Sequence, residues 1–185
     1  MEENNENSLK QQNDILRIAV LGPESTGKST LSEQLAIHYK TIWMPEYARE
    51  YLKNKADSYN LEDILKIAQH QLQLEKNNFS NAKKIIFADT ELIIAKVWCE
   101  AVYKICPDWI SKNMIQNKYD FYLLTYPDIP WEPDPLRENP HRRDFFFRWY
   151  EQELKNMNAQ YAIIKGFGKD RLQNSISAID HFLKK

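Results

Sequence analysis

Residues 22–29 have the residue types and the spacing of a phosphate-binding loop. They read Gly-Pro-Glu-Ser-Thr-Gly-Lys-Ser, which matches the pattern G-x-x-x-x-G-K-S/T without a mismatch. Glycine allows a tight turn and a close approach of the backbone to phosphate, and the N–H groups at the start of a following helix attract an anion. We therefore predict that this loop binds ATP. The alternative is a glycine-bracketed turn that holds no ligand.

Two side chains of the loop have expected roles of their own. Lys28 would reach the β- and γ-phosphates with a mobile positive charge, and the Ser29 hydroxyl can be a ligand of Mg²⁺. ATP and Mg²⁺ are therefore the expected cofactors. The loop residues that we predict to bind ATP are Gly22, Glu24, Ser25, Thr26, Gly27, Lys28, Ser29 and Thr30.

A first carboxylate, Asp89, directly follows the apolar run of residues 85–88. In open α/β sheets, ligands bind at the carboxyl ends of the strands. We predict that Asp89 holds Mg²⁺, directly or through water, or takes a catalytic role. The alternative is that Asp89 or Thr90 caps the helix expected to begin near Glu91.

A second carboxylate, Glu46, follows another apolar run, at residues 41–44. It would lie beside the phosphate-binding loop and could accept a hydroxyl proton during phosphoryl transfer. The alternative is a solvated helix face on which Glu46 and Glu50 lie one turn apart and repel each other. The sequence leaves open whether Glu46 or Asp89 is the general base.

Residues 126–143 form one long irregular segment, with five of the eight prolines of the chain. A loop of this length in a compact domain is usually a lid, a binding loop or disordered, and prolines stiffen it. We predict a lid in which Arg137 and Arg142 close over the triphosphate and neutralise developing charge. The alternative is a solvated, charged loop. Trp131 in the lid and Trp43 border the expected cleft, so either could stack on a planar ring.

Gly166-Phe167-Gly168-Lys169-Asp170 follows the last apolar run. We predict that this loop wraps the adenine base, with Gly168 and Asp170 among the ATP-binding residues. The alternative is a simple turn between a strand and a helix.

The elements that must position these residues alternate along the chain. Such alternation predicts an α/β fold of three layers, in which helices cover both faces of a five-stranded parallel sheet. The apolar runs that we interpret as strands are residues 16–21, 41–44, 84–88, 119–124 and 161–165. The amphipathic segments that we interpret as helices are residues 28–39, 61–79 and 91–105, and a last helix that carries Leu172, Ile176, Ile179 and Leu183.

Composition limits the possible partners. The 185 residues carry 25 basic and 26 acidic side chains. The chain therefore lacks the excess of basic residues that would favour nucleic acid or an anionic membrane as the main partner. Residues 1–14 are almost wholly polar and lack a basic-then-apolar pattern, so we expect a disordered tail and a cytoplasmic protein. Residues 15–185 are expected to form a single domain. Oligomeric state is not predicted.

Several of these pieces together resemble the ribosylnicotinamide kinase domain of NadR-type proteins. The resemblance covers nearly the whole chain after residue 14. Residues 22–30 are similar to that family's phosphate-binding loop, which many NTPases share. The other matching pieces are Glu46-Tyr47-Ala48-Arg49-Glu50-Tyr51, Asp89-Thr90-Glu91, Pro130-Trp131, Asp134, Leu136-Arg137 and Arg142, of which the Glu-Tyr-x-Arg and Pro-Trp…Leu-Arg pieces are far more specific.

The resemblance implies a P-loop NTPase fold like that of nucleoside and nucleotide kinases, with an Arg/Pro-rich lid. It also implies ATP-dependent phosphorylation of nicotinamide riboside at its 5′-hydroxyl, giving nicotinamide mononucleotide. The substrate would be a small-molecule nucleoside, and the residues expected to bind it are Trp43, Glu46, Tyr47, Arg49, Asp89 and Trp131. Two alternatives stay open: a kinase for another nucleoside or small hydroxyl compound, and a nucleotide-binding switch with slow ATP hydrolysis.

Overall fold

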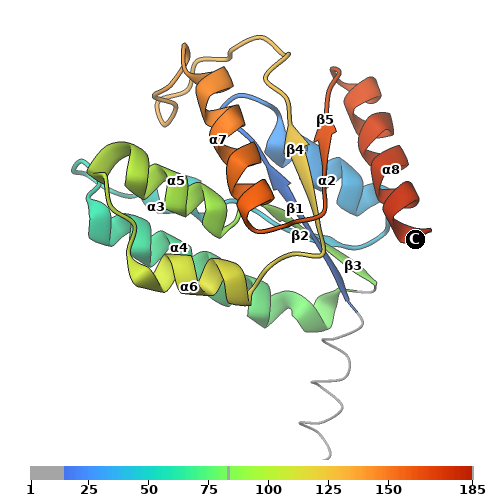
Figure 1. Cartoon of the computed structure of the whole chain (residues 1–185), viewed down its shortest axis with the longest axis horizontal. Helices are drawn as coiled ribbons and strands as arrows, with labels where there is room; N and C mark the ends of the chain where they lie inside the picture. The colour runs from blue at the N-terminus through green and yellow to red at the C-terminus, as the bar shows by residue number, and fades with distance from the viewer. Residues whose placement is uncertain (1–14, 83, 185) are drawn as a thin grey trace, which may run out of the picture.

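Five parallel strands form the centre of the protein, as the alternation of strands and helices predicted (Figure 1). The computed structural model describes residues 15–82 and 84–184, so the tail expected at residues 1–14 lies outside the described residues. The strand order is β2-β3-β1-β4-β5, and each neighbouring pair is parallel. The strands are β1 Leu16–Leu21, β2 Ile42–Met44, β3 Ile85–Asp89, β4 Phe121–Thr125 and β5 Tyr161–Ile164.

Helices cover both faces of the sheet and complete the three layers. Alternate residues of a strand point to opposite faces. Accordingly, Ile18 and Val20 of β1 pack in one hydrophobic cluster with α2 and α8, whereas Ala19 and Leu21 pack in another with α4, α5, α6 and α7. The helices are α2 Lys28–His38, α3 Tyr47–Lys53, α4 Leu61–Asn78, the 3₁₀ turn η1 Phe79–Asn81, α5 Leu92–Tyr103, α6 Asp108–Gln116, α7 Arg143–Asn156 and α8 Lys169–Leu183.

The sequence did not predict α6. This helix has nine residues and buries only Ile110 and Met114, so its apolar period is too short to stand out. It packs beside α5 and lies far from the edge of the sheet at which the strands end (Figure 1). Missing it therefore changes nothing in the expected site.

The carboxyl ends of all five strands meet at one edge of the sheet, because every strand runs in the same direction. β1 lies at the centre, and the chain adds β3 on one side of it and β4 on the other. Open α/β sheets bind their ligands at such a switch point. The loop after β1 and the acidic end of β3 are thus brought side by side.

Gly22, directly after β1, is a position that only glycine can occupy. Its φ is +149°, and a Cβ atom there would lie 2.8 Å from the carbonyl oxygen of Thr125 and overlap the Thr125 side chain. The end of β4 therefore packs directly against the start of the loop. This contact fixes where the loop leaves the sheet.

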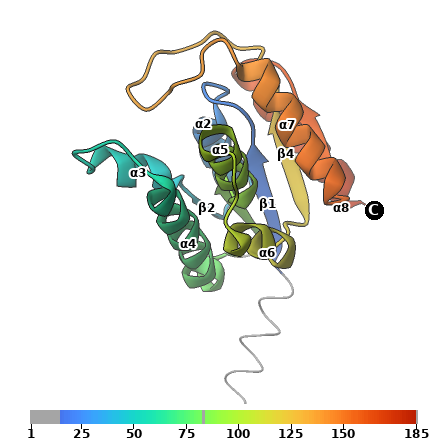
Figure 2. The same cartoon turned by 60° about the vertical axis from the view of Figure 1, so that its left-hand side comes forward.

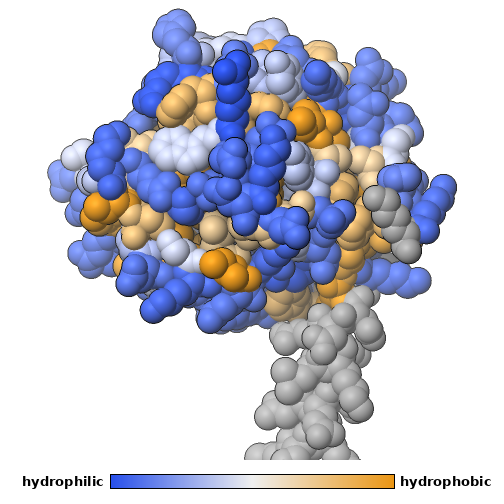
Figure 3. All heavy atoms as spheres, in the orientation of Figure 1, coloured by the Kyte–Doolittle hydropathy of each residue, from blue (hydrophilic) through white to orange (hydrophobic). Residues whose placement is uncertain are grey.

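Hydrophobic side chains on the face seen in Figure 3 form separate patches among hydrophilic ones. The exposed large apolar residues come from several elements, among them Ile37 of α2, Val102 of α5 and Phe167 between β5 and α8. Within residues 15–82 and 84–184, no helix combines the length and the apolar character that crossing a membrane requires.

Candidate active site

The loop between β1 and α2 is held in shape by its own hydrogen bonds and by the end of β4. The Thr26 hydroxyl lies 2.9 Å from the Pro23 carbonyl oxygen and 2.7 Å from the hydroxyl of Thr125. Lys28 Nζ donates to the same Pro23 carbonyl at 3.0 Å. Gly27, with φ of +73°, is the N-cap of α2 and has no side chain to occupy the first N–H groups of the helix. Those N–H groups are therefore available to an anion.

Asp89 ends β3 beneath this loop as a buried carboxylate. Asp89 is 1 % exposed, and neither of its carboxylate oxygens is hydrogen-bonded to any residue that the structure describes. The capping alternative is wrong, because the side chain of Glu91 accepts the Ile93 N–H at 2.9 Å and is the N-cap of α5. Asp89 thus keeps both oxygens for a ligand.

Burial raises the pKa of Asp89, and the positive charge of Lys28 opposes this shift. Mg²⁺ is usually held by one or two carboxylates with waters and phosphate oxygens, rather than by a protein cage. Accordingly, the described part of the chain holds no cluster of three His, Cys, Asp or Glu side chains that would suit a metal ion. A buried carboxylate with unused oxygens beside a phosphate-binding loop fits Mg²⁺ held together with Ser29.

Glu46 follows β2 at the N-terminal end of α3 and lines the same cavity as the loop. Burial raises its pKa; the charge of Lys28 opposes the shift, and the nearby carboxylate of Asp89 adds to it. The two carboxylates and the lysine therefore form one electrostatic group. Glu50 lies one turn further along α3 and is exposed, so the two glutamates do not share a solvated face.

The segment between β4 and α7 lies over the phosphate-binding loop and extends over the ends of the strands (Figure 2). The backbone N–H of Glu132 donates to Ser25 Oγ at 2.9 Å. The carboxylate of Glu24 accepts the backbone N–H groups of Glu138 and Asn139 at 3.1 Å and 2.9 Å. Arg49 of α3 forms an ion pair with Asp134 at 2.8 Å. These contacts give the segment the position expected of a lid.

The lid arginines divide between the loop and the cavity wall. Arg137 donates to Ser25 Oγ at 3.4 Å and to the Glu132 carbonyl oxygen. Arg143 donates to the Ser25 carbonyl oxygen at 3.2 Å. The Arg142 guanidinium instead lies over the rings of Phe145 and Phe146, 4.8 Å and 5.0 Å from their centres, and lines the cavity. Arg143, the last arginine of the 137–143 stretch, thus contacts the loop directly.

A single cavity of about 1070 Å³ runs from the phosphate-binding loop to the wall formed by α5 and α7. Its far half is lined by four aromatic residues, Tyr59, Trp98, Phe146 and Tyr150. The rings of Tyr59 and Trp98 meet edge to face, with centres 4.9 Å apart. The Tyr59 hydroxyl donates to Glu138 of the lid at 3.0 Å. This half has the size and the ring surfaces to receive a small planar molecule.

The structure does not place every expected residue in the cavity. Trp43 packs with the cluster beneath α2 and α8, because strand alternation turns it to that face. The Tyr47 ring stacks on His70, with centres 3.8 Å apart, outside the cavity. Trp43, Tyr47, Trp131 and Asp170 are absent from the residues that line it. The structure thus places Trp43, Tyr47 and Trp131 outside this cavity, and Tyr59, Trp98, Phe146 and Tyr150 are among the aromatic residues that line it.

Residues 17–171 match the family described as AAA domain. The chain belongs to this family. Its sequence is 28 % identical over 157 residues to the trifunctional NAD biosynthesis/regulator protein NadR of Salmonella typhimurium. That match covers 82 % of this chain and 38 % of the relative, so the chain spans well under half the relative's length. The resemblance to NadR-type proteins seen in the sequence motifs is confirmed.

Solved structures show where the fold belongs. A NadR protein in complex with NR is similar with a TM-score of 0.82 and 20 % identity, over 95 % of this chain and 53 % of that one. A deoxyadenosine kinase from M. mycoides is similar with a TM-score of 0.61 and 12 % identity, over 90 % of this chain and 100 % of that one. The protein therefore has the fold of P-loop kinases.

Proposed function

We propose that the protein is a kinase that transfers the γ-phosphoryl group of ATP to the 5′-hydroxyl group of nicotinamide riboside, giving nicotinamide mononucleotide. One observation carries this proposal: the phosphate-binding loop and a pocket with aromatic walls belong to the same cavity. A protein that only binds and slowly hydrolyses ATP needs no such second pocket. The likeness to a NadR protein with bound NR supports the choice of acceptor.

The residues of the loop would hold and neutralise the phosphates. Lys28 moves from the Pro23 carbonyl to the β- and γ-phosphates, and Arg137 of the lid stabilises the transferring group. When bound, Mg²⁺ held by Ser29 and Asp89 supplies further positive charge at the phosphates. Phosphoryl transfer needs little covalent help from the protein, so position and charge account for most of the catalysis.

Glu46 is the residue that would orient the hydroxyl group and accept its proton. It lines the cavity, whereas Asp89 lies beneath the loop and is not among the lining residues. Its raised pKa makes it a stronger base than an ordinary carboxylate. The sequence left open which of the two carboxylates is the base, and we therefore assign Glu46 as the base and Asp89 as a ligand of the metal ion.

The acceptor half of the cavity offers aromatic faces and carboxylates to a ring that carries positive charge. Besides the aromatic walls, the carboxylates of Glu46, Asp57 and Glu138 line the cavity, and so do the cationic side chains of Arg49, Lys55 and Arg142. Aromatic faces and carboxylates both attract a cation. The pyridinium ring of nicotinamide riboside is such a cation, whereas the bases of ordinary nucleosides are neutral.

Steady-state kinetics with ATP and a panel of nucleosides tests the proposal. Nicotinamide riboside should give the highest kcat/KM, with nicotinamide mononucleotide detected by chromatography. A higher kcat/KM for a neutral nucleoside would identify a kinase with another acceptor. ATP hydrolysis that no nucleoside stimulates would identify a nucleotide-binding switch.

A further inference from the structure

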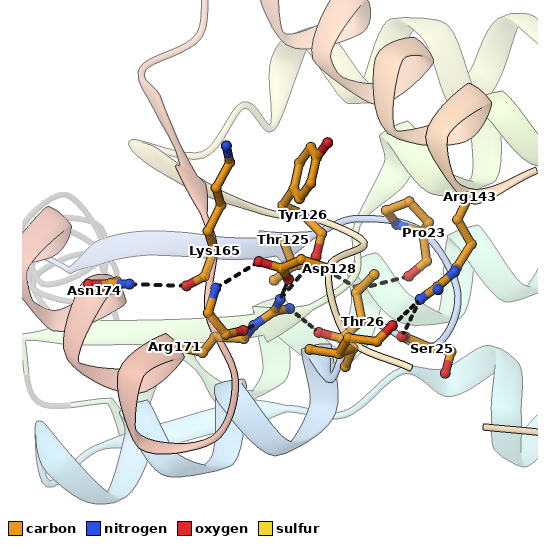
Figure 4. A network of polar contacts seen from close by, with 12 residues as sticks. Pro23, Ser25, Thr26, Thr125, Tyr126, Asp128, Arg143, Lys165, Arg171 and Asn174 are labelled. Atoms are coloured by element: carbon orange, nitrogen blue, oxygen red, sulfur yellow. Dashed lines mark hydrogen bonds and ion pairs between the residues drawn. The ribbon is translucent and has the colours of Figure 1, made fainter. Parts of the chain in front are cut away.

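One buried arginine joins three segments at the edge of the sheet. Arg171, in the first turn of α8, is 4 % exposed (Figure 4). Its guanidinium donates to the Thr26 carbonyl oxygen of the phosphate-binding loop at 2.5 Å and to the Tyr126 carbonyl oxygen after β4 at 3.0 Å. Its Nε donates to the Gly166 carbonyl oxygen at 2.7 Å. One rigid fork thus holds the phosphate-binding loop, the start of the lid and the β5–α8 loop, residues 165–168.

Asp128 completes this attachment. One of its carboxylate oxygens forms an ion pair with Arg171, and the other accepts the backbone N–H of Gly166 at 2.8 Å. The carboxylate therefore connects the lid segment to the β5–α8 loop and to the first turn of α8. Lysine offers a point charge rather than a planar fork, so it cannot reproduce the Arg171 contacts.

The β5–α8 loop presents an aromatic ring at the rim of the cavity. Phe167 is 72 % exposed and lines the cavity together with Gly168. The β5–α8 loop lies on the α8 side of the phosphate-binding loop, whereas α5, which carries Trp98, lies on the opposite side (Figure 1). With the acceptor on the α5 side, the base of a nucleotide whose phosphates fill the loop must leave on the α8 side.

The sequence predicts that this loop wraps the adenine base of ATP; we propose that Phe167 stacks on that base, and that Arg171 and Asp128 are positioning residues that fix the β5–α8 loop against the phosphate-binding loop. The proposal rests on the proposed function, because ATP is the donor in that reaction. Its consequence is that the base and the phosphates of the nucleotide bind to segments locked together by one ion pair. Neither positioning residue needs to contact the nucleotide.

Calorimetric titration with ADP and with inorganic pyrophosphate separates the base from the phosphates. Asp128→Asn removes the charge that pairs with Arg171 and weakens the hold on Gly166, but it removes no direct contact of the phosphate-binding loop. The variant should lower the affinity for ADP about tenfold, as expected for a lost charge-assisted hydrogen bond. The affinity for pyrophosphate should change less than about twofold. Arg171→Lys should weaken both ligands, because it also releases Thr26. Asp180→Asn, an exposed carboxylate of α8, is the matched control.

Phe167→Ala keeps the proposal falsifiable if the buried variants do not fold, because an exposed ring contributes little to the core. It should weaken ADP about fivefold and leave pyrophosphate unchanged, as expected for a lost stacking contact. Ile37→Ala is the matched control, since Ile37 is 71 % exposed on α2. The proposal would be overturned if the ratio of the affinity for ADP to the affinity for pyrophosphate equalled the wild-type ratio in both Asp128→Asn and Phe167→Ala.

The failure of the proposed function has a different signature. A wild-type protein that binds neither ADP nor pyrophosphate contradicts ATP as the donor, and this proposal with it. A wild-type protein that binds ADP and phosphorylates nicotinamide riboside, but whose variants keep the wild-type ratio, contradicts the role of Phe167, Arg171 and Asp128 alone.

Discussion

The two halves of the cavity are built in different ways. The phosphate half comes from one continuous stretch, residues 22–29, and offers mostly backbone groups. The acceptor half is made of side chains from α5, α7, the lid and the segment between α3 and α4. Backbone groups recognise phosphate whatever molecule carries it, whereas side chains can distinguish one acceptor from another. The difference separates a general nucleotide site from a site whose selectivity depends on a few exchangeable residues.

The largest effect is expected in the phosphate half. Lys28→Ala should lower kcat about 1,000-fold, because it removes the mobile charge at the transferring group. The thermal midpoint should change little, since the one hydrogen bond of Lys28 Nζ within the described residues goes to the Pro23 carbonyl. Lys112→Ala on α6 is the control, with an exposed lysine far from the cavity. A wild-type kcat in Lys28→Ala would contradict the role of the phosphate-binding loop in catalysis.

Glu46, at the junction of the two halves, should give the next largest effect. Glu46→Gln should lower kcat about 100-fold, as expected for the loss of a general base. In the wild type, activity should fall as pH falls through the raised pKa of Glu46, because only the carboxylate form accepts a proton. The variant should lack this acidic limb. Glu50→Gln, on the exposed side of α3, should keep both the wild-type rate and the acidic limb. A pH–rate profile of each variant makes this comparison.

A smaller and more selective effect is expected in the acceptor half. Tyr59→Phe keeps the ring but removes the hydroxyl that donates to Glu138. The KM for nicotinamide riboside should rise about fivefold, as expected for one lost hydrogen bond, with the KM for ATP unchanged. Tyr161→Phe removes a similar bond to Glu151 outside the cavity and should change neither KM. Equal changes in both KM values for Tyr59→Phe would mean that the two halves are not separable.

Glu91 belongs to neither half, and its replacement should leave the kinetics unchanged. Burial raises its pKa to about 8, so the unfolded chain releases this proton at a lower pH than the folded protein does. The folded wild type therefore loses stability as pH rises from the usual glutamate range to about 8. Glu91→Gln keeps an oxygen for the Ile93 N–H and avoids this loss. Its thermal midpoint should exceed that of the wild type by a few degrees at about pH 8 and equal it at about pH 4, whereas exposed Glu62→Gln should show no such trend.

Local patterns were enough to predict the fold and the strand, loop and helix that form the phosphate half. The strand, the glycine-bracketed loop and the helix of the phosphate site are consecutive in the chain, so their geometry follows from neighbouring residues. The position of Asp89 beside the loop could be predicted, because parallel strands bring their carboxyl ends to one edge of the sheet. Whether Asp89 or Thr90 caps α5 could be decided only from the structure, in which the side chain of Glu91 is the cap.

The acceptor half could not be predicted, because it depends on contacts between distant segments. Tyr59 and Trp98 are far apart in the chain, and the period of α5 indicates that Trp98 faces inward but not that it faces a cavity. Trp43 was misplaced because alternation along a strand does not say which face of the sheet lies under the ligand. Arg171 was missed because its acceptors are carbonyl groups of three separate loops, which leave no pattern in the sequence.

The way Glu24 binds the lid has a consequence for how this protein can change over evolution. Glu24 accepts the backbone N–H groups of residues 138 and 139, and every amino acid except proline carries such a group. The side chain of Glu138 is thereby left to bind Tyr59 in the acceptor half. Selection, or a protein engineer, can therefore exchange the side chain at position 138 and alter the preferred acceptor while the lid stays attached to the phosphate-binding loop.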